Sequence, residues 1–189
     1  GRRISFYDPD RENLVAQVSA KKILRQGNGK KTVLLIDCGA KQNIARCLLK
    51  RGLSVITVPW NFDPFTETRP RRSQARDLRG LKLKFDAIVI SNGPGDPKMA
   101  DRTIRTIKKA ISKKIPILGI CLGNQLLALA AGGNTYKLKF GHRSQNQPCI
   151  LKGTSRCFIT TQNHGFAISK MPLGFETWFK NANDSSNEG

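Results

Sequence analysis

The stretch "IPILGICLGNQLLALAAGG", residues 115–133, decides the fold of this chain. An apolar run of strand length is followed at once by an apolar run of helix length, and Cys121 lies between them, flanked by Gly119 and Gly123. A residue on the tight turn between a buried strand and a helix is pushed out at the top of a sheet, where a flanking Cβ would clash with the turn. The stretch therefore predicts a strand, a sharp turn that presents the cysteine, and a helix.

The same alternation of strand and helix patterns precedes this stretch. Apolar runs typical of buried strands and runs with helical spacing follow one another at 31–39, 40–52, 53–60, 85–97 and 100–114. After Gly133 the pattern changes to shorter β-like pieces at 134–140, 156–162, 164–169 and 176–182. The sequence predicts an α/β fold, with a mostly parallel central sheet, flanking helices and a smaller antiparallel extension.

The charge and the apolar content of the sequence restrict the kinds of partner that the protein can have. The 189 residues carry a formal net charge of +20, from 33 Lys and Arg against 13 Asp and Glu. The densest basic run, 69–84, holds no aromatic side chain that could stack on bases, so we interpret it as a solvated loop and expect no nucleic acid. No apolar run approaches the roughly 18–20 residues of a membrane span, and the first residues lack a signal peptide's apolar core. We expect a cytoplasmic protein with no membrane partner.

The five cysteines are odd in number, irregularly spaced and free of CxxC pairs, so we expect reduced thiols and no metal site. Cys121 is the one cysteine whose position in the sequence suggests a chemical role. At a helix N-terminus its pKa is expected to be lowered, and backbone N–H groups there can hold an oxyanion. The alternative is that Cys121 is a small buried apolar residue, as most single cysteines are.

Several separate motifs resemble the class I (triad) glutamine amidotransferases: "GICLGNQLLALAAGG" (119–133), "SNGPGDP" (91–97) and "TTQNHGFAIS" (160–169). The likeness runs from about Phe6 to Gly189. Within that family it is similar to the glutamine-hydrolysing small subunit of carbamoyl-phosphate synthetase, on the stretches "LLIDCGAKQNIARCLLKRG" (34–52), "YKLKFGHRSQNQP" (136–148) and "NANDSSNEG" (181–189).

The resemblance implies a role for each matching residue. Cys121 would attack the side-chain amide of glutamine, giving a γ-glutamyl thioester and ammonia, and water would then release glutamate. The turn at Gly93 and Gly95 would form the oxyanion hole together with the N–H of Leu122. The residues that would bind the α-amino and α-carboxylate end of glutamine are Gln125, Asn163, Gly165 and Phe166.

The resemblance implies a catalytic triad of a cysteine, a base and a group that orients the base, and the base is missing from this sequence. The family takes its base and orienting group from a His-Pro-Glu motif, whereas this chain holds only His142 and His164, neither followed by Pro-Glu. In the family both histidines belong to other motifs. We expect the motif beyond Gly189, and we interpret 30–189 as an amidotransferase domain incomplete at its C-terminus. Residues 1–29 are interpreted as a linker from a missing N-terminal small-subunit domain. A triad without its base loses several orders of magnitude in rate, so we expect these residues alone to hydrolyse glutamine poorly.

The resemblance also implies a partner. Ammonia would pass to a synthetase that uses ATP and bicarbonate, either the large subunit of carbamoyl-phosphate synthetase or a fused domain. ATP and Mg are expected on that partner, and no cofactor in this chain, because no GxxxxGK[ST] phosphate-binding sequence occurs. Two alternatives stay open: a non-catalytic interaction domain of the same fold, or the glutaminase of another synthetase, such as those for anthranilate, GMP or CTP.

Overall fold

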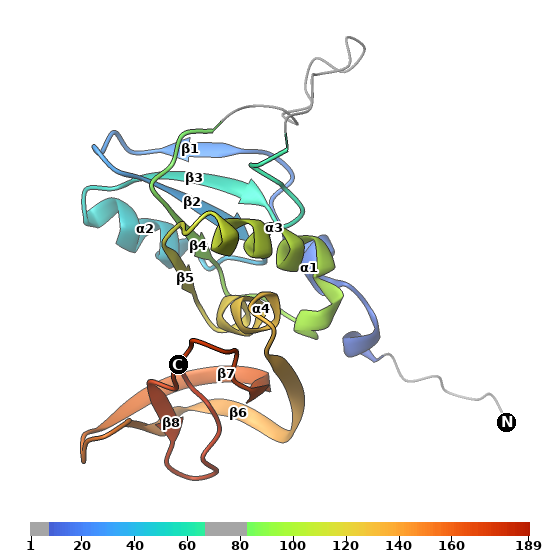
Figure 1. The fold of residues 1–189 in the computed structure, drawn as a ribbon, viewed down its shortest axis with the longest axis vertical. Coiled ribbons are helices and arrows are strands. Elements are labelled where there is room, and N and C mark those ends of the chain that lie inside the picture. Colours follow the sequence, from blue (N-terminus) through green and yellow to red (C-terminus); the bar gives the residue numbers. More distant parts are fainter. Residues whose placement is uncertain (1–7, 67–82) are drawn as a thin grey trace, which may run out of the picture.

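A five-stranded sheet forms the centre of the molecule in the computed structural model, which describes residues 8–66 and 83–189 (Figure 1). Its strand order is β1-β3-β2-β4-β5, with β1 antiparallel to β3 and all other neighbours parallel. The strands are β1 (Leu24–Gln26), β2 (Thr32–Asp37), β3 (Ser54–Pro59), β4 (Ala87–Ile90) and β5 (Ile117–Gly119). The basic run predicted as a solvated loop lies mostly outside the described residues.

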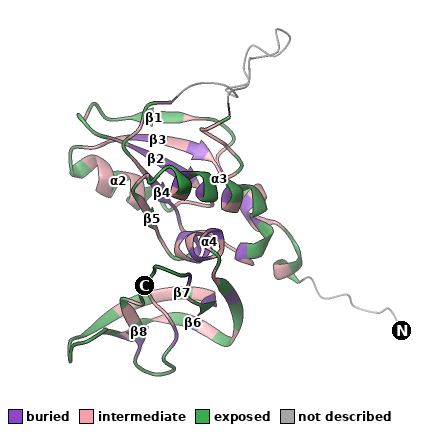
Figure 2. Ribbon diagram, viewed as in Figure 1, coloured by how far each residue is buried: buried purple, intermediate pink, exposed green. Residues whose placement is uncertain are grey.

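Helices cover both faces of this sheet because its strands are apolar on both faces. On β2, Val33 and Leu35 pack with the helix α2, while Leu34 and Ile36 belong to the larger core under the other helices. Figure 2 shows this buried interior. The helices are α1 (Leu14–Val18), α2 (Gln42–Lys50), α3 (Asp101–Ser112) and α4 (Leu122–Ala130), with short 3-10 turns η1 (Pro9–Arg11) and η2 (Pro97–Met99). Among the described residues no helix is long and apolar enough to cross a bilayer.

A second sheet lies beyond α4, which runs between the two sheets in Figure 1. It is antiparallel, in the order β7-β6-β8, with β6 (Asn134–Leu151), β7 (Cys157–Lys170) and β8 (Phe179–Asn181). The predicted fold class, including the antiparallel extension, is confirmed. β6 and β7 are longer than the sequence indicated, because irregularities in their pairing absorb the polar stretch from Gly141 to Gln147 without ending the strand, whereas β8 is shorter than the predicted piece at 176–182.

Part of the segment interpreted as a linker packs on the domain. Val15 on α1 is 1% exposed and belongs to the main core, and β1 extends the sheet through Leu24 and Gln26. Sequence periodicity gives no signal here, since α1 is five residues long and every residue of β1 is exposed. The presence of a further domain before this segment stays a prediction.

Candidate active site

The turn between β5 and α4 holds Cys121 in a backbone conformation that few residues adopt. Its φ is 53° and its ψ is −110°, and it is the N-cap residue of α4. Such a conformation costs about 1–3 kcal/mol in a residue other than glycine, and it persists only where the surroundings impose it. The side chain is exposed and lies on the wall of a cavity. The presentation of the cysteine on a sharp turn therefore matches the sequence-based prediction.

Close backbone packing explains the two glycines of the turn. A Cβ on Gly119 would lie 2.5 Å from the backbone carbon and oxygen of Gly123, and a Cβ on Gly123 would lie 2.3 Å from the carbonyl oxygen of Ile90. Both distances are shorter than any tolerable contact with a Cβ. The helix can therefore start directly above β4 and β5 only where these two side chains are absent.

All eight residues that the resemblance singled out line one cavity of about 1060 Å³. They come from three places: the turn after β4, the N-terminal end of α4, and the middle of β7. The carboxyl ends of the parallel strands thus face the small sheet across a single hollow. The residues are Gly93, Gly95, Cys121, Leu122, Gln125, Asn163, Gly165 and Phe166.

The turn at 92–95 is held against neighbouring loops. A Cβ on Gly93 would lie 2.2 Å from the carbonyl oxygen of Cys38 and 2.7 Å from Leu122 Cδ2, so only glycine allows this approach. Gly95 has a φ of +82°, which glycine adopts at no steric cost. Asn92 accepts a hydrogen bond from the Lys41 backbone N–H at 3.0 Å and donates one to the Gly39 carbonyl at 3.3 Å. The turn is thereby fixed beside the cysteine.

The electrostatics of the thiol differ from the sequence-based expectation. Cys121 is exposed to the cavity, and desolvation by the surrounding walls raises the pKa of its thiol, which the charge of Glu188 raises further. A hydrogen bond from the Leu122 N–H and the charge of Lys41 oppose the rise but do not reverse it. The expected lowering of the pKa by the helix N-terminus is therefore wrong in net direction, because desolvation of the thiol outweighs the hydrogen bond from the local N–H. A thiol of this kind needs a base to become a nucleophile.

The two histidines do not supply that base in this arrangement. His164 lines the cavity, but its ring nitrogens lie 2.8 Å from the Phe166 carbonyl and 3.2 Å from Gln162 Oε1. His142 is 8% exposed and faces Asp184 at 2.8 Å. Within residues 8–66 and 83–189 no imidazole is hydrogen-bonded to the Cys121 thiol.

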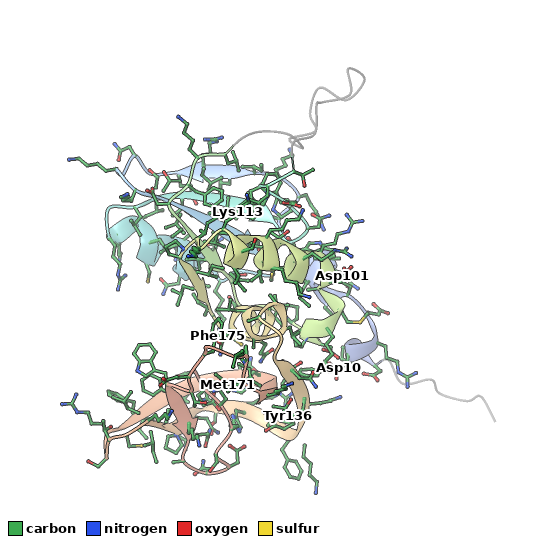
Figure 3. All side chains as sticks on the ribbon, viewed as in Figure 1. Asp10, Asp101, Lys113, Tyr136, Met171 and Phe175 are labelled. Carbon is green, nitrogen blue, oxygen red and sulfur yellow. The ribbon has the colours of Figure 1, made fainter. Side chains whose placement is uncertain are left out.

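Sequence reasoning missed the basic lining of the cavity. Lys41, Arg51, Lys137 and Arg143 are among the lining residues, against the single carboxylate of Asp10 in the described part of the chain. Asp10 is itself paired with Lys137, and Figure 3 shows Asp10 and Tyr136 at the same end of the small sheet. For Lys41 a signal existed: it follows the carboxyl end of the first core strand, where sites form in parallel sheets.

A sequence profile of the family described as "Glutamine amidotransferase class-I" matches residues 34–189 of the chain. The chain is 45% identical over 98% of its length to "Multifunctional protein CAD" of Squalus acanthias, covering 8% of that protein. It is 41% identical over 98% of its length to "Carbamoyl phosphate synthase arginine-specific small chain" of Saccharomyces cerevisiae, covering 44% of it. It is 40% identical over its whole length to the human "Carbamoyl-phosphate synthase [ammonia], mitochondrial", covering 12%. The chain thus spans less than half the length of each of these relatives.

Solved structures agree on the fold. A "putative gmp synthase" protein from Thermoplasma acidophilum superimposes with a TM-score of 0.62 at 22% identity, covering 82% of this chain and 75% of that one. A glutamine amidotransferase from Thermotoga maritima gives a TM-score of 0.60 at 17% identity, covering 85% and 70%.

Proposed function

Because the chain belongs to the class I glutamine amidotransferase family, we propose that its cavity is a glutaminase site that supplies ammonia for carbamoyl phosphate synthesis. The names of the relatives from Squalus acanthias and Saccharomyces cerevisiae support the second half of this proposal. One observation carries the first half. The exposed thiol of Cys121, held at a φ of 53°, lies in the same cavity as the glycine turn and the polar groups of β7.

The reaction begins with attack of the Cys121 sulfur on the side-chain amide carbon of glutamine. The C–S bond forms as the C–N bond breaks, and the departing nitrogen leaves as ammonia with the proton taken from the thiol. Water then attacks the thioester, which releases glutamate and restores the thiol. The negative charge on the carbonyl oxygen in each step is held by the Leu122 N–H and the turn at Gly93 and Gly95. Such donors are worth about 3–4 kcal/mol each.

The charge of the cavity suits this substrate. Glutamine carries a carboxylate at the end remote from the reacting amide, and the lining provides Lys41, Arg51 and Arg143 beside the already paired Lys137. The amide and carbonyl groups of Gln125, Asn163, Gly165 and Phe166 hold the α-amino and α-carboxylate end. A net positive lining strengthens carboxylate binding because the walls exclude bulk water.

A histidine from outside these 189 residues completes the triad in this proposal. A second cavity, of about 410 Å³, also reaches Cys121 and is lined by Gly119, Asn124 and Trp178 among others. An imidazole placed in this cavity lies beside the thiol, because Cys121 lines it. It removes the thiol proton and gives it to the leaving nitrogen.

The ammonia passes to a synthetase that uses ATP, Mg and bicarbonate, either a large subunit or a fused domain. Two kinds of relative support this: a small chain in Saccharomyces cerevisiae and a multifunctional protein in Squalus acanthias. Ammonia protonates readily in neutral water, so a closed path between the two sites preserves the reactive form. No cofactor is proposed for the glutaminase reaction itself.

The test uses the full natural chain that contains these residues, with its synthetase. We expect glutamine-dependent carbamoyl phosphate synthesis to be abolished in Cys121→Ser, while synthesis from ammonium chloride is retained. Cys157→Ser is the matched control, because Cys157 is also exposed but does not line the cavity. A chloroketone analogue of glutamine should alkylate Cys121 alone, as read by peptide mass spectrometry.

The same experiment separates the alternatives. A non-catalytic interaction domain predicts equal synthesis in the wild type and in Cys121→Ser, and no labelling by the analogue. A glutaminase that serves another synthetase predicts labelling of Cys121 and glutamine hydrolysis, but no carbamoyl phosphate. The first result overturns the proposed glutaminase activity, and the second overturns the proposed role in carbamoyl phosphate synthesis.

A further inference from the structure

The small sheet brings together three side chains that the sequence keeps far apart. His142 on β6 and His164 on β7 are directly opposite each other in the antiparallel register, and their rings meet edge to face with centroids 4.9 Å apart. Glu188 reaches them from the segment after β8, which is anchored by bridges from Asn187 to Ile168 and Lys180. One ligand atom from each of the three lies within 4.8 Å of the other two.

In each imidazole, the nitrogen that points away from Glu188, called here the outer nitrogen, already faces a hydrogen-bond acceptor. His164 Nδ1 lies 2.8 Å from the Phe166 carbonyl oxygen, which can only accept, so Nδ1 carries the proton. His142 Nε2 lies 2.8 Å from Asp184 Oδ2, which as a carboxylate also only accepts. In the neutral rings, the lone pairs are therefore on His142 Nδ1 and His164 Nε2, the two nitrogens that face Glu188.

These inner nitrogens meet further acceptors instead of donors. His142 Nδ1 is buried and makes no hydrogen bond, although Glu188 Oε1 is 3.1 Å away. His164 Nε2 lies 3.4 Å from Glu188 Oε2 and 3.2 Å from Gln162 Oε1. Two lone pairs that point at a carboxylate are unfavourable unless a positive charge lies between them.

We propose that His142 Nδ1, His164 Nε2 and the Glu188 carboxylate bind one Zn²⁺ ion. Two imidazoles and one carboxylate are a common zinc ligand set, with a fourth position left for water. Ligands about 2.0–2.2 Å from a tetrahedral ion lie about 3.3–3.6 Å apart. His142 Nδ1 is 3.1 Å from Glu188 Oε1 and His164 Nε2 is 3.4 Å from Glu188 Oε2, so each imidazole faces a different oxygen of the carboxylate at about this separation. The ion joins the segment after β8 to the β6–β7 pair.

The surroundings of the three ligands fit this assignment. A metal-bound histidine donates its other N–H to a carboxylate or backbone carbonyl, as both rings do here. The Ser186 hydroxyl donates to Glu188 Oε1 at 2.9 Å, which orients the carboxylate. His142 and Glu188 have side chains only 10% and 9% exposed, so the ion is shielded from water. The irregular spacing of residues 142, 164 and 188 explains why the sequence indicated no metal.

Zinc binding to the full natural chain tests the proposal. After exhaustive treatment with a chelator, titration with Zn²⁺ alone should restore one tightly held equivalent per chain and raise the melting temperature. Glu188→Gln and His142→Asn should each weaken zinc binding at least about 100-fold, and Asp184→Asn about 10-fold to 100-fold. Glu188→Gln is expected to fold, because its amide can donate to one of the inner nitrogens.

Controls exclude other ligands. Glu176→Gln, at an exposed glutamate paired with Lys152, should leave zinc binding unchanged. Cys121→Ser and Cys157→Ser should also retain it, and cobalt in place of zinc should give no thiolate charge-transfer band. The proposal is overturned if the wild type holds no stoichiometric zinc, which means that protons supply the positive charge. Unchanged affinity in folded Glu188→Gln, or a sulfur ligand to cobalt, overturns it equally.

Discussion

Gln125 Nε2 donates a 2.7 Å hydrogen bond to the carbonyl oxygen of Phe166. This buried bond joins α4, whose N-cap is Cys121, to the strand of the small sheet that carries Asn163. Cys121, in the turn after β5 of the central sheet, and part of the proposed glutamine-binding wall on the small sheet are therefore held together by a side chain one turn away from the thiol.

Replacing Gln125 with Met should loosen this connection. The substitution keeps the volume but removes one of the two donors to the buried Phe166 carbonyl and leaves the other, His164 Nδ1–H, in place. The loss of one such hydrogen bond costs about 0.5–1.5 kcal/mol of unfolding free energy. We expect a lower urea midpoint and a raised KM for glutamine. Gln42→Met is the control: Gln42 is exposed, its side chain accepts a hydrogen bond from Arg46, and its change in unfolding free energy should stay below about 0.5 kcal/mol. Equal midpoints for the two variants would contradict this account.

Gly123→Ala should destabilise the elbow for a purely steric reason. The new Cβ would lie 2.3 Å from the Ile90 carbonyl oxygen, so α4 must move off the sheet. We expect a loss of at least about 2 kcal/mol and no glutaminase activity. Gly52→Ala is the comparison variant: Gly52 has a φ of +74° but open space around it, so this substitution measures the cost of the left-handed backbone without a steric clash. Its cost should be about 1–2 kcal/mol, from the left-handed backbone alone. Chemical denaturation measures both.

Lys41→Met should make Cys121 a weaker nucleophile. The charge of Lys41 lowers the pKa of the thiol against the opposing effect of burial, so its removal shifts the pKa upward. The rate of iodoacetamide alkylation at pH 8 should fall, and the whole pH profile should move to higher pH. Lys41→Arg should restore the profile, and Lys50→Met, at the far end of α2, should not change it. A profile that stays in place in Lys41→Met rules out this role of the charge.

Cys38 should make stability depend on pH in alkaline solution. Burial raises the pKa of this fully buried thiol to about 12, despite a hydrogen bond with Thr103. Because the folded pKa lies above the unfolded one, the unfolded chain loses its proton first as pH rises. At pH 10 this favours the unfolded state by about 1–2 kcal/mol relative to pH 7.

Comparing the pH dependence of two variants isolates this contribution. Between pH 7 and pH 10, Cys38→Ala should lose less unfolding free energy than the wild type, by the same 1–2 kcal/mol. Cys157→Ser, at an exposed thiol, should follow the wild type. Parallel curves for all three proteins would mean that Cys38 titrates normally in the folded state.

The sequence predicted those parts of the molecule that depend on local pattern. The apolar run of β2, the helical spacing of Ile44 and Leu48, and the glycines around Cys121 each act within a few residues, and the structure agrees with all of them. The turn at Cys121 was predictable because its steric requirement for residues without a Cβ falls on Gly119 and Gly123, which are close to it in the sequence.

Contacts set by strand register were not predictable. The pairing of β6 with β7 shifts register three times, between Asn134 and Thr135, between Lys137 and His142, and between Ser144 and Gln147. Each shift changes which residues meet across the sheet, so the approach of His142 to His164 follows from no spacing in the sequence. The pKa of Cys121 likewise depends on packing by distant segments, including Glu188.

The strain at Cys121 bears on how such a protein evolves. A glycine at this position would adopt a φ of 53° without penalty, so Cys121→Gly should relieve part of the backbone strain while removing the thiol. A duplicated protein that no longer had to catalyse the reaction would therefore become more stable if this cysteine mutated to glycine. Folding alone disfavours a cysteine at this turn, so the proposed nucleophile is retained at a cost in stability.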